Sequence, residues 1–392
     1  MNVLLIAPEF PPNFFQFATS LSACGHPPFA MGQADFAELS PALRQALRWY
    51  VRCDLNDRHA FLAALQHLTR DILPGHGWGR LDIVESHNEH WMAHEALANE
   101  TLALTGIRPA DIEHLQNKAR MKEIFRDAQL PGPRGDLVNN AEEALRLGPR
   151  LGFPQILKPA VGVGAGGVRR IDSFADLSAA APTIRTPHVL EEFITAPIVT
   201  YDGLVDWHGR VVFDNMLVYG AGVLEALLGG DAFFHTSREI PPPLREAGQR
   251  LVQEFGIRRK FFHFEFFDVE GRYVPIEINA RPPGGPILDM MNYSFDGNLY
   301  KTWAEIVAAP TATPASQGHL KPYHCAYASR RHRRYRHSHE EIVKRLGSSL
   351  MDYCENPPLF QAAMGQYRYI FRSKSRDEVN ELGRFIQDVL PE

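Results

Sequence analysis

The sequence predicts an α/β protein in which an N-terminal parallel layer precedes a mixed α+β region and a smaller C-terminal part. Three observations lead to this class. The first hundred residues alternate short apolar runs with segments of helical spacing, as parallel α/β layers do. From Asn117 onward, strand-like segments come in pairs around turns that contain glycine, which favours hairpins. The length of 392 residues suggests two or three domains.

The N-terminal elements follow from apolar runs and from the residues that end them. Residues 1–7 form a short apolar run stopped by Pro8, which predicts a buried strand. Residues 14–24 place apolar side chains at helical spacing and end at Gly25, a common helix terminator. The other expected elements here are helices 57–72 and 89–104 and strand 81–85.

The second half is expected to contain more strands than helices. Residues 153–158 read as a strand that is cut off by Pro159. The other expected strands are 189–194, the hairpins 204–206 with 211–216 and 261–269 with 273–280, and 367–372. Helices are expected at 118–128, 141–147, 246–255 and from 377 onward. A stretch rich in Ala, Thr and Pro at 311–317 predicts a linker.

Composition excludes several classes of protein. Forty-one Lys and Arg against 46 Asp and Glu give a net charge of -5, which does not favour a protein that coats nucleic acid or anionic membranes. The four cysteines are too scattered for a disulfide framework or a zinc site. Residues 1–7 lack the basic flank of an export signal, and no uncharged run approaches the roughly 18 residues that span a bilayer. We therefore expect a cytoplasmic protein with no nucleic-acid or membrane partner.

The first chemical signal is a lysine at a strand end followed by a run of glycines. Lys158 precedes the glycines of the segment 161–168. Those glycines are Gly162, Gly164, Gly166 and Gly167. They would let backbone N–H groups approach a polyphosphate closely, and the lysine would add a positive charge. The segment has neither the Gly-Lys-Ser/Thr of a P-loop nor the order of a dinucleotide fingerprint, and a flexible glycine turn is the alternative.

The second signal lies in the hairpin formed by 261–269 and 273–280. Side chains alternate faces along a strand, so Glu277, Asn279 and Arg281 share one face. A symmetric hairpin about Gly271 places Glu265 opposite Glu277. Two opposed carboxylates destabilise a sheet, and bound divalent cations would remove that penalty. The flanking Phe, Val and Ile residues favour a buried Mg²⁺ site over an exposed hairpin with incidental acids.

The third signal is an apolar strand, 188–194, that contains Glu191 and Glu192. Such a strand can offer backbone groups to an adenine edge and a carboxylate to its amine or to a ribose. In this order and spacing, the three signals and the helix-start Lys118 closely resemble the ATP-grasp superfamily of carboxylate–amine ligases. The resemblance covers about 117–286, and the run 275–285 looks most like the amino-acid (dipeptide) ligases and the biotin-carboxylase-like members.

The resemblance implies an ATP-grasp fold with an additional domain before it and a lid after it. The expected division is an N-terminal α/β domain 1–112, a small subdomain with the glycine loop 113–188, a central subdomain with the metal-binding hairpin 189–310, and a C-terminal lid 311–392.

The resemblance also implies how ATP would be bound. Lys118 and Lys158 would contact its phosphates, and the glycine loop would close over them. The adenine pocket would be lined by Glu191, Glu192 and Ile194. Ile198 stands where family members often carry a ribose-binding acid, so Asp202 is expected to take that role.

Metal ions and the reaction are implied in the same way. Glu265, Glu277 and Asn279 would hold two Mg²⁺ ions, with Mn²⁺ as a substitute. Arg281 would hold the acyl phosphate and the tetrahedral intermediate, and Lys158 would assist catalysis. In this family a carboxylate is activated as an acyl phosphate, which an amine then attacks with release of phosphate. We therefore expect an ATP-dependent ligase for a small carboxylic acid, with an amino acid favoured.

Several weaker signals are substrate candidates. Two residues follow strand 81–85, where α/β sheets usually contact ligands; two lie between the hairpins, where such ligases build an acceptor pocket; and two glycines follow the arginine motif. These six residues are Asn88, Glu89, His235, Arg238, Gly284 and Gly285. A structural histidine is the alternative for His235.

Three questions stay open at the level of sequence. The basic run 330–337 fits a solvated loop, a lid segment that contacts an anion, or, least well, a nucleic-acid contact. The alternative functions are a biotin-carboxylase-like enzyme that uses bicarbonate and an ATP-binding regulatory module without turnover. Homodimers are common in the resembled family, so a homodimer is one arrangement to consider.

Overall fold

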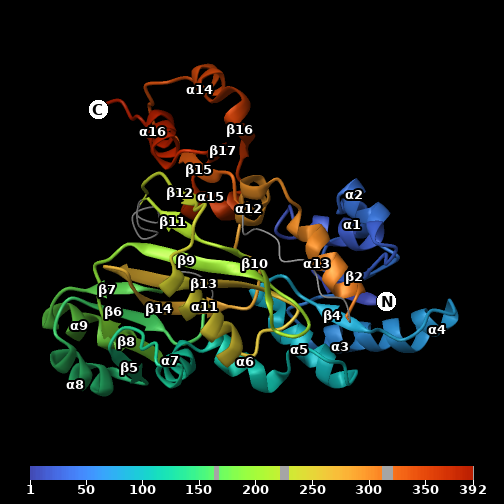
Figure 1. Cartoon of the computed structure of the whole chain (residues 1–392). Coiled ribbons are helices and arrows are strands. Elements are labelled where there is room, and N and C mark those ends of the chain that lie inside the picture. The colour runs from blue at the N-terminus through green and yellow to red at the C-terminus, as the bar shows by residue number, and fades with distance from the viewer. Residues whose placement is uncertain (163–166, 221–228, 311–320, 392) are drawn as a thin grey trace.

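The computed structural model describes residues 1–162, 167–220, 229–310 and 321–391, and the described strands form three sheets (Figure 1). The N-terminal sheet is parallel, with the order β3-β2-β1-β4, which confirms the predicted parallel layer. Its strands are β1 (Val3–Ile6), β2 (Phe29–Gly32), β3 (Trp49–Arg52) and β4 (Ile83–Glu85). The helices of this part are α1 (Phe15–Ala23), α2 (Pro41–Ala46), α3 (Arg58–His67), α4 (Leu73–Gly75) and α5 (Met92–Thr101).

A small antiparallel sheet follows, with the order β5-β8-β6-β7. Helices α6 (Pro109–Gln116) and α7 (Lys118–Asp127) lead into it. Its elements are β5 (Gly135–Val138), α8 (Ala141–Leu151), β6 (Gln155–Pro159), β7 (Arg169–Ile171), α9 (Phe174–Ala180) and β8 (His188–Glu192). The expected division after residue 188 thus falls at the beginning of a strand that pairs with both β5 and β6.

The large sheet has the order β14-β13-β9-β11-β12-β15-β17-β16, and β10 pairs with β9 beside it. Its strands are β9 (Ile198–Val205), β10 (Val211–Asn215), β11 (Leu217–Tyr219), β12 (Phe233–Thr236), β13 (Phe261–Val269), β14 (Arg272–Asn279), β15 (His324–Arg330), β16 (Leu350–Glu355) and β17 (Tyr367–Ser373). Its helices are α11 (Pro242–Glu254), α12 (Ile287–Phe295), α13 (Leu299–Ala308), α14 (His339–Leu346), α15 (Pro358–Met364) and α16 (Arg376–Ile386). The C-terminal strands therefore continue the sheet that carries the β13–β14 hairpin. The expected linker 311–317 lies outside the described residues.

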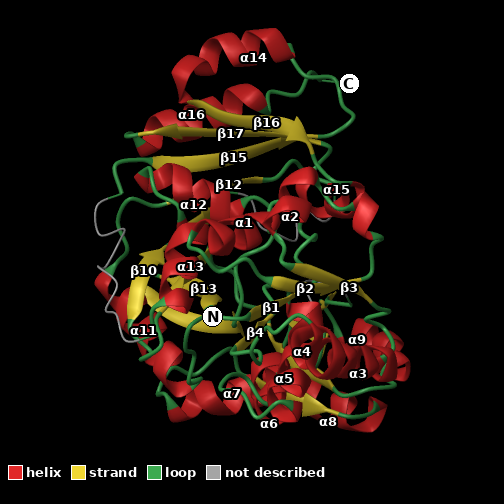
Figure 2. Cartoon of the chain, turned by 90° about the vertical axis from the view of Figure 1, so that its right-hand side faces the viewer, coloured by secondary structure: helices red, strands yellow, loops and turns green. Residues whose placement is uncertain are grey.

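The small sheet and the C-terminal helices lie at opposite ends of the molecule. Both views place α14 and β16 at one end and α8 at the other (Figures 1 and 2). The large sheet runs between these ends, and the parallel N-terminal sheet lies to one side of it (Figure 1). No helix in the described ranges is long and apolar enough to cross a membrane.

The β13–β14 hairpin has the predicted pairing of Glu265 with Glu277, but its turn and its register differ from the symmetric hairpin that was expected. Its tight turn consists of Glu270 and Gly271, both at positive φ, so the turn is centred between these residues rather than at Gly271. This turn alone would pair Glu265 with Ile276. A one-residue bulge shifts the register beyond Phe266, and Glu265 lies opposite Glu277.

Alternation along β13 separates the core from the candidate site. Phe262, Phe264 and Phe266 are fully buried and pack in one cluster with side chains of α11. Each buried phenylalanine contributes roughly 1.5–3 kcal/mol through removal of its ring from water. The other face of the same strand carries His263 and Glu265, which line a cavity. The apolar half of the strand thus fixes the position of its polar half.

Candidate functional site

Most of the predicted nucleotide, metal and catalytic side chains converge on one cavity between the small and the large sheet. The cavity has a volume of about 300 Å³ and lies between β6 and β8 on one side and β13 and β14 on the other. The predicted residues that line it are Lys118, Lys158, Glu191, Glu192, Ile194, Glu265, Glu277, Asn279 and Arg281. The fold therefore gathers charged side chains that are more than 160 positions apart in the chain.

Glu191 is a buried carboxylate that holds two lysines. Its oxygens lie 2.6 Å from Lys158 Nζ and 2.8 Å from Lys122 Nζ. Burial raises the pKa of Glu191, but the two ammonium groups outweigh it, and the pKa lies below its usual value. Burial lowers the pKa of Lys122 in spite of this carboxylate. Lys122 was not predicted as a site residue, although it lies one helical turn after Lys118 on the same helix.

Lys118 reaches the cavity because it is the first residue of α7. The side chain of Asn117 caps this helix by accepting a hydrogen bond from the Ala119 backbone N–H at 3.0 Å. Lys118 Nζ lies 2.9 Å from Glu277 Oε1 and donates to the Gly162 carbonyl at 3.0 Å. The lysine therefore connects α7, the beginning of the glycine segment and β14.

The two opposed carboxylates each have a cationic partner. Burial raises the pKa of Glu277, and the facing Glu265 raises it further against the effect of Lys118. Burial also raises the pKa of Glu265, but His263 outweighs it, and the net pKa is lowered. His263 Nε2 lies 3.5 Å from Glu265 Oε1, and its Nδ1 lies 2.6 Å from Asp202 Oδ1. Burial lowers the pKa of His263, whereas the two carboxylates raise it to about 9.

His263 is a second residue that the sequence analysis missed. It lies two positions before Glu265 on the same strand, so the alternation rule would have placed it on the same face. Asp202 was expected to bind a ribose, but it is fully buried behind His263 and does not line the cavity. We correct that assignment, because the Asp202 carboxylate is occupied by the imidazole and by the Thr200 hydroxyl. Ile198 does line the cavity.

Glu89 brings the N-terminal part of the chain into the site. Its Oε2 lies 3.0 Å from Arg281 Nε. With the Asn279 amide oriented so that its nitrogen faces Glu89, that nitrogen donates to the two carboxylate oxygens at 2.9 and 3.2 Å. Glu89 is only 4% exposed and begins the short helical turn after β4. The weak prediction for Glu89 thus corresponds to a direct contact with the predicted catalytic arginine. Asn88 caps the same turn by accepting from His90 N–H and does not line the cavity.

The other end of the cavity is largely apolar. Residues of both sheets form it: Ile156, Val168, Phe193, Ile194, Ile198, Phe267 and Ile276. Glu192 lies at the rim, 2.7 Å from Arg134, and Arg170 lies over the Phe193 ring at 4.4 Å. A charged end and an apolar end in one cavity match the phosphates and the base of a nucleoside triphosphate.

The remaining predicted residues lie elsewhere or outside the described ranges. Gly164 and Gly166 lie outside the described residues, and Gly162 and Gly167 flank that gap. His235 is buried, with Nδ1 3.0 Å from its neighbour's carbonyl oxygen, and burial lowers its pKa to about 4. Arg238 donates to the Lys321 and Lys374 carbonyls, while Gly284 and Gly285 do not line the cavity. The structure therefore brings none of these four residues to the cavity.

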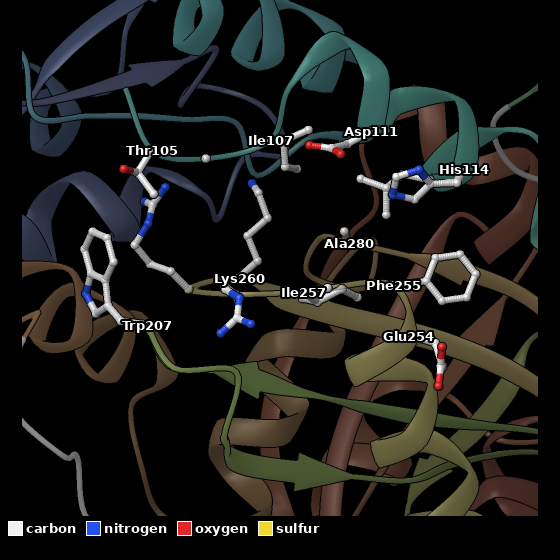
Figure 3. Close-up of a pocket in the computed structure, with 15 residues that line it drawn as sticks. Thr105, Ile107, Asp111, His114, Trp207, Glu254, Phe255, Ile257, Lys260 and Ala280 are labelled. Carbon is white, nitrogen blue, oxygen red and sulfur yellow. The ribbon is translucent and has the colours of Figure 1, made fainter. Parts of the chain in front are cut away.

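A second cavity of about 360 Å³ lies between α6 and the end of α11 (Figure 3). Asp111 and His114 face it from α6, and Phe255 lies across from them (Figure 3). Lys260 also lines it, with its ammonium bound to the carboxylates of Glu85 and Glu95. No predicted site residue lines this cavity. Ala280 does line it, and this residue lies between Asn279 and Arg281 in the sequence. The charged site residues belong to the smaller cavity.

Residues 151–289 match the family model described as the ATP-grasp domain. The chain contains an ATP-grasp domain. Apart from Lys118, Lys122, Arg134 and Glu89, the contacting side chains in and around the first cavity fall within the matched range.

Curated relatives and solved structures resemble this ATP-grasp chain over different lengths. D-alanine–D-alanine ligase from Corynebacterium urealyticum is 31% identical over 187 residues, which cover 44% of this chain and 52% of that protein. The chain spans only part of its curated relatives: it covers between 22% and 52% of the lengths of four of them.

Two solved structures match almost the whole chain in fold. L-amino acid ligase from Bacillus licheniformis has a TM-score of 0.75 at 17% identity and covers 100% of this chain and 98% of its own. N5-carboxyaminoimidazole ribonucleotide synthetase from Thermus thermophilus has a TM-score of 0.69 at 14% identity, with 100% and 99% covered. At these identities the likeness shows the fold, which confirms the predicted ATP-grasp fold with its N-terminal α/β part.

Proposed function

We propose that the chain is an ATP-dependent ligase that joins a small carboxylic acid, in the first instance an amino acid, to an amine. The observation that carries this proposal is the convergence of Lys118, Lys158, Glu277 and Arg281 on one cavity with an apolar end. Relatives and structural neighbours that are named as amino-acid ligases support the reaction class.

ATP is the substrate that this cavity suits. Its apolar end, with Ile198 and Phe267, would accept the base, and its cationic end would accept the phosphates. Glu191 on β8 holds Lys158, and Glu277 on β14 holds Lys118, so the positions of both lysines are fixed before a ligand arrives. Fixed charges of this kind stabilise developing negative charge without reorganisation.

The donor set on the hairpin fits Mg²⁺. In the described part of the chain, no group of three or more His, Cys, Asp or Glu side chains could hold a metal ion by itself. Glu265 and Glu277 supply carboxylate oxygens from facing strands, and Asn279 supplies an amide oxygen, which are hard ligands suited to Mg²⁺. The phosphates of ATP would have to complete the coordination. Bound Mg²⁺ would neutralise charge on those phosphate oxygens.

The chain's own residues would bind and orient the reactants. A substrate carboxylate oxygen attacks the γ-phosphorus, the bond to ADP breaks, and an acyl phosphate forms. An amine then attacks the acyl carbon, and phosphate leaves with the new amide bond in place. Arg281 would pair with the reacting carboxylate, and Glu89 holds its Nε at 3.0 Å. No nucleophile of the protein is required, because positioning and electrostatics carry such a reaction.

The experiment is Mg²⁺-dependent phosphate release from ATP, measured with amino acids and other small acids, singly and in pairs. We expect release that needs one particular pair, with a product mass equal to both substrates less one water. Arg281→Gln should abolish it, whereas Arg272→Gln, exposed at the other end of β14, should not. Release with bicarbonate alone would favour a biotin-carboxylase-like reaction. ATP binding without release for any substrate would favour a regulatory module.

A further inference from the structure

A groove with a concentration of arginine and tyrosine side chains lies on the C-terminal part of the chain, far from the ATP-grasp cavity. Its volume is about 520 Å³, within the roughly 300–1,000 Å³ that is usual for small-molecule sites. The ten described residues that line it are all Arg, His or Tyr, so among the described residues no carboxylate and no aliphatic side chain lines it. The groove belongs to the elements around α14 and β16, at the opposite end of the molecule from α8 (Figure 1).

The cationic side of the groove is the basic run that the sequence analysis left unassigned. Arg330, Arg331, Arg333 and Arg334 line it. Arg330, the last residue of β15, is only 8% exposed, whereas His332, Arg333 and Arg334 are exposed as expected for a solvated loop. Arg330 Nε and Nη1 donate to carbonyls at 2.6 and 2.7 Å, and its buried Nη2 has no hydrogen-bond partner among the described residues. A buried guanidinium nitrogen without a partner indicates a place for an acceptor.

The arginines are held by backbone carbonyl groups. Arg331 donates to the carbonyls of Gly230 and Ala362, and Arg333 donates to the carbonyl of Gly229. The nearby Asp231 is engaged by the Tyr335 hydroxyl at 2.9 Å to each carboxylate oxygen. Carbonyls position a guanidinium without cancelling its charge, and the Asp231 carboxylate, which interacts with Arg330, Arg331 and Arg333, offsets one charge of the four arginines, so the lining keeps an excess of positive charge.

The aromatic side of the groove is a stack of rings on neighbouring strands. Tyr353 of β16 lies opposite Tyr369 of β17, with ring centroids 4.7 Å apart. The His339 ring lies 4.2 Å from that of Tyr353. Tyr367 adds a further ring two positions before Tyr369 on the same strand face. Tyr353 remains 37% exposed, so the stack ends in an open ring.

We propose that this groove binds a small nucleotide, with its phosphate on the arginines and its base on the tyrosine stack, separately from ATP in the catalytic cavity. Arginine is suited to phosphate because its planar donors match two phosphate oxygens. A base stacks on tyrosine with little dependence on sequence, so any nucleoside monophosphate serves as a first probe. This inference does not depend on the proposed ligase function.

The test is calorimetric titration of the full chain with AMP, adenosine and inorganic phosphate. We expect one AMP site per chain that persists in Lys158→Gln, with adenosine and phosphate each bound at least ten-fold more weakly. Arg334→Gln and Tyr353→Ala, both at exposed positions, should each weaken AMP binding about ten-fold. Arg336→Gln is the matched control, because Arg336 is exposed, is paired with Asp388 at 2.8 Å and does not line the groove.

Several results would overturn the proposal. AMP binding that is absent, or that is lost in Lys158→Gln, would show that this groove holds no separate nucleotide site. Equal effects of Arg334→Gln and Arg336→Gln would indicate attraction by general charge alone. Adenosine bound as tightly as AMP would exclude the phosphate contact. A single-stranded RNA 12-mer that binds while AMP does not would assign the groove to nucleic acid instead.

Discussion

Two adjacent glutamates on β8 should differ sharply in their contribution to stability. Glu191 is 6% exposed in its side chain and contacts two buried lysines, Lys158 and Lys122. Glu192 is 24% exposed and contacts Arg134, whose side chain is 72% exposed. Glutamine has nearly the shape of glutamate, so Glu191→Gln and Glu192→Gln each remove one charge and leave the volume unchanged.

The magnitudes follow from burial. Glu191→Gln leaves two buried ammonium groups without their carboxylate, and removal of one partner of a buried pair usually lowers the free energy of unfolding by about 3–5 kcal/mol. Glu192→Gln removes a surface pair, for which about 0–1 kcal/mol is usual. We therefore expect a difference of roughly 2–5 kcal/mol between two substitutions at neighbouring positions.

The assay is urea unfolding at several pH values, followed by circular dichroism and tryptophan fluorescence together. In Glu191→Gln the pKa of Lys122 should fall further below its unfolded value, so the folded state binds fewer protons than the unfolded state. Stability then rises with pH, and the loss in this variant should shrink as pH rises towards 10. Equal losses in the two variants, or a loss in Glu191→Gln that does not change with pH, would refute this reasoning.

Three further substitutions test the site and its surroundings. Glu277→Gln should lower phosphate release more than 100-fold without unfolding the chain. Glu270→Gln, at the exposed turn of the same hairpin, should leave phosphate release unchanged. Normal release in Glu277→Gln would contradict the metal assignment. Glu89→Gln should lower kcat with little change in the KM for ATP, because it frees Arg281 and leaves the lysines in place; a change in that KM alone would count against this positioning role. Burial raises the pKa of Glu95 to about 7, with Glu85 adding to the effect and Lys260 opposing it. Between about pH 4.5 and 7 the folded state therefore binds a proton that the unfolded state has lost. The contribution of Glu95 to stability should therefore decline as pH rises through that window, and unfolding curves of Glu95→Gln should lack this decline.

The sequence predicted the parts of the fold that local patterns determine. β1, β13 and β17 appear close to their expected bounds because their apolar runs are strong and end at prolines or turns. β2 and β3 were missed because each strand has only four residues, which is too short to show a periodic signal. The opposition of Glu265 and Glu277 was predicted correctly although the bulge was not foreseen, because the bulge offsets the displaced centre of the turn.

The contacts between distant elements could not be predicted from spacing. Nothing local indicates that Glu89, after β4, meets Arg281, or that Glu191 takes both Lys158 and Lys122. Asp202 was expected at a ribose because Ile198 stands where family members often carry the ribose-binding acid, yet the strand order places Asp202 behind His263. These pairings depend on sheet order and on the approach of the two sheets, which the chain specifies only through its packed core.

The cavity contains counter-ions for its own charges, and this predicts how it responds to metal. Lys118 pairs with Glu277 and Lys158 with Glu191, so each of these buried lysines has a carboxylate partner in the cavity without ATP. Binding of ATP would exchange partners, with phosphate taking Lys118 and Mg²⁺ taking Glu277. Mg²⁺ without ATP must instead compete with the Lys118 ammonium 2.9 Å from Glu277.

Removal of that competitor should therefore strengthen Mg²⁺ binding while it weakens ATP binding. We expect Lys118→Met to bind Mg²⁺ alone at least ten-fold more tightly than the wild-type chain, measured by calorimetric titration with MgCl₂. The same variant should bind ATP more weakly, because a phosphate contact is lost. Lys301→Met is the control, since Lys301 is exposed on α13 and pairs only with Glu305 among the described carboxylates. Unchanged Mg²⁺ affinity in Lys118→Met would show that Glu277 is not a metal ligand, because a ligand freed from an ammonium ion must bind a cation more readily.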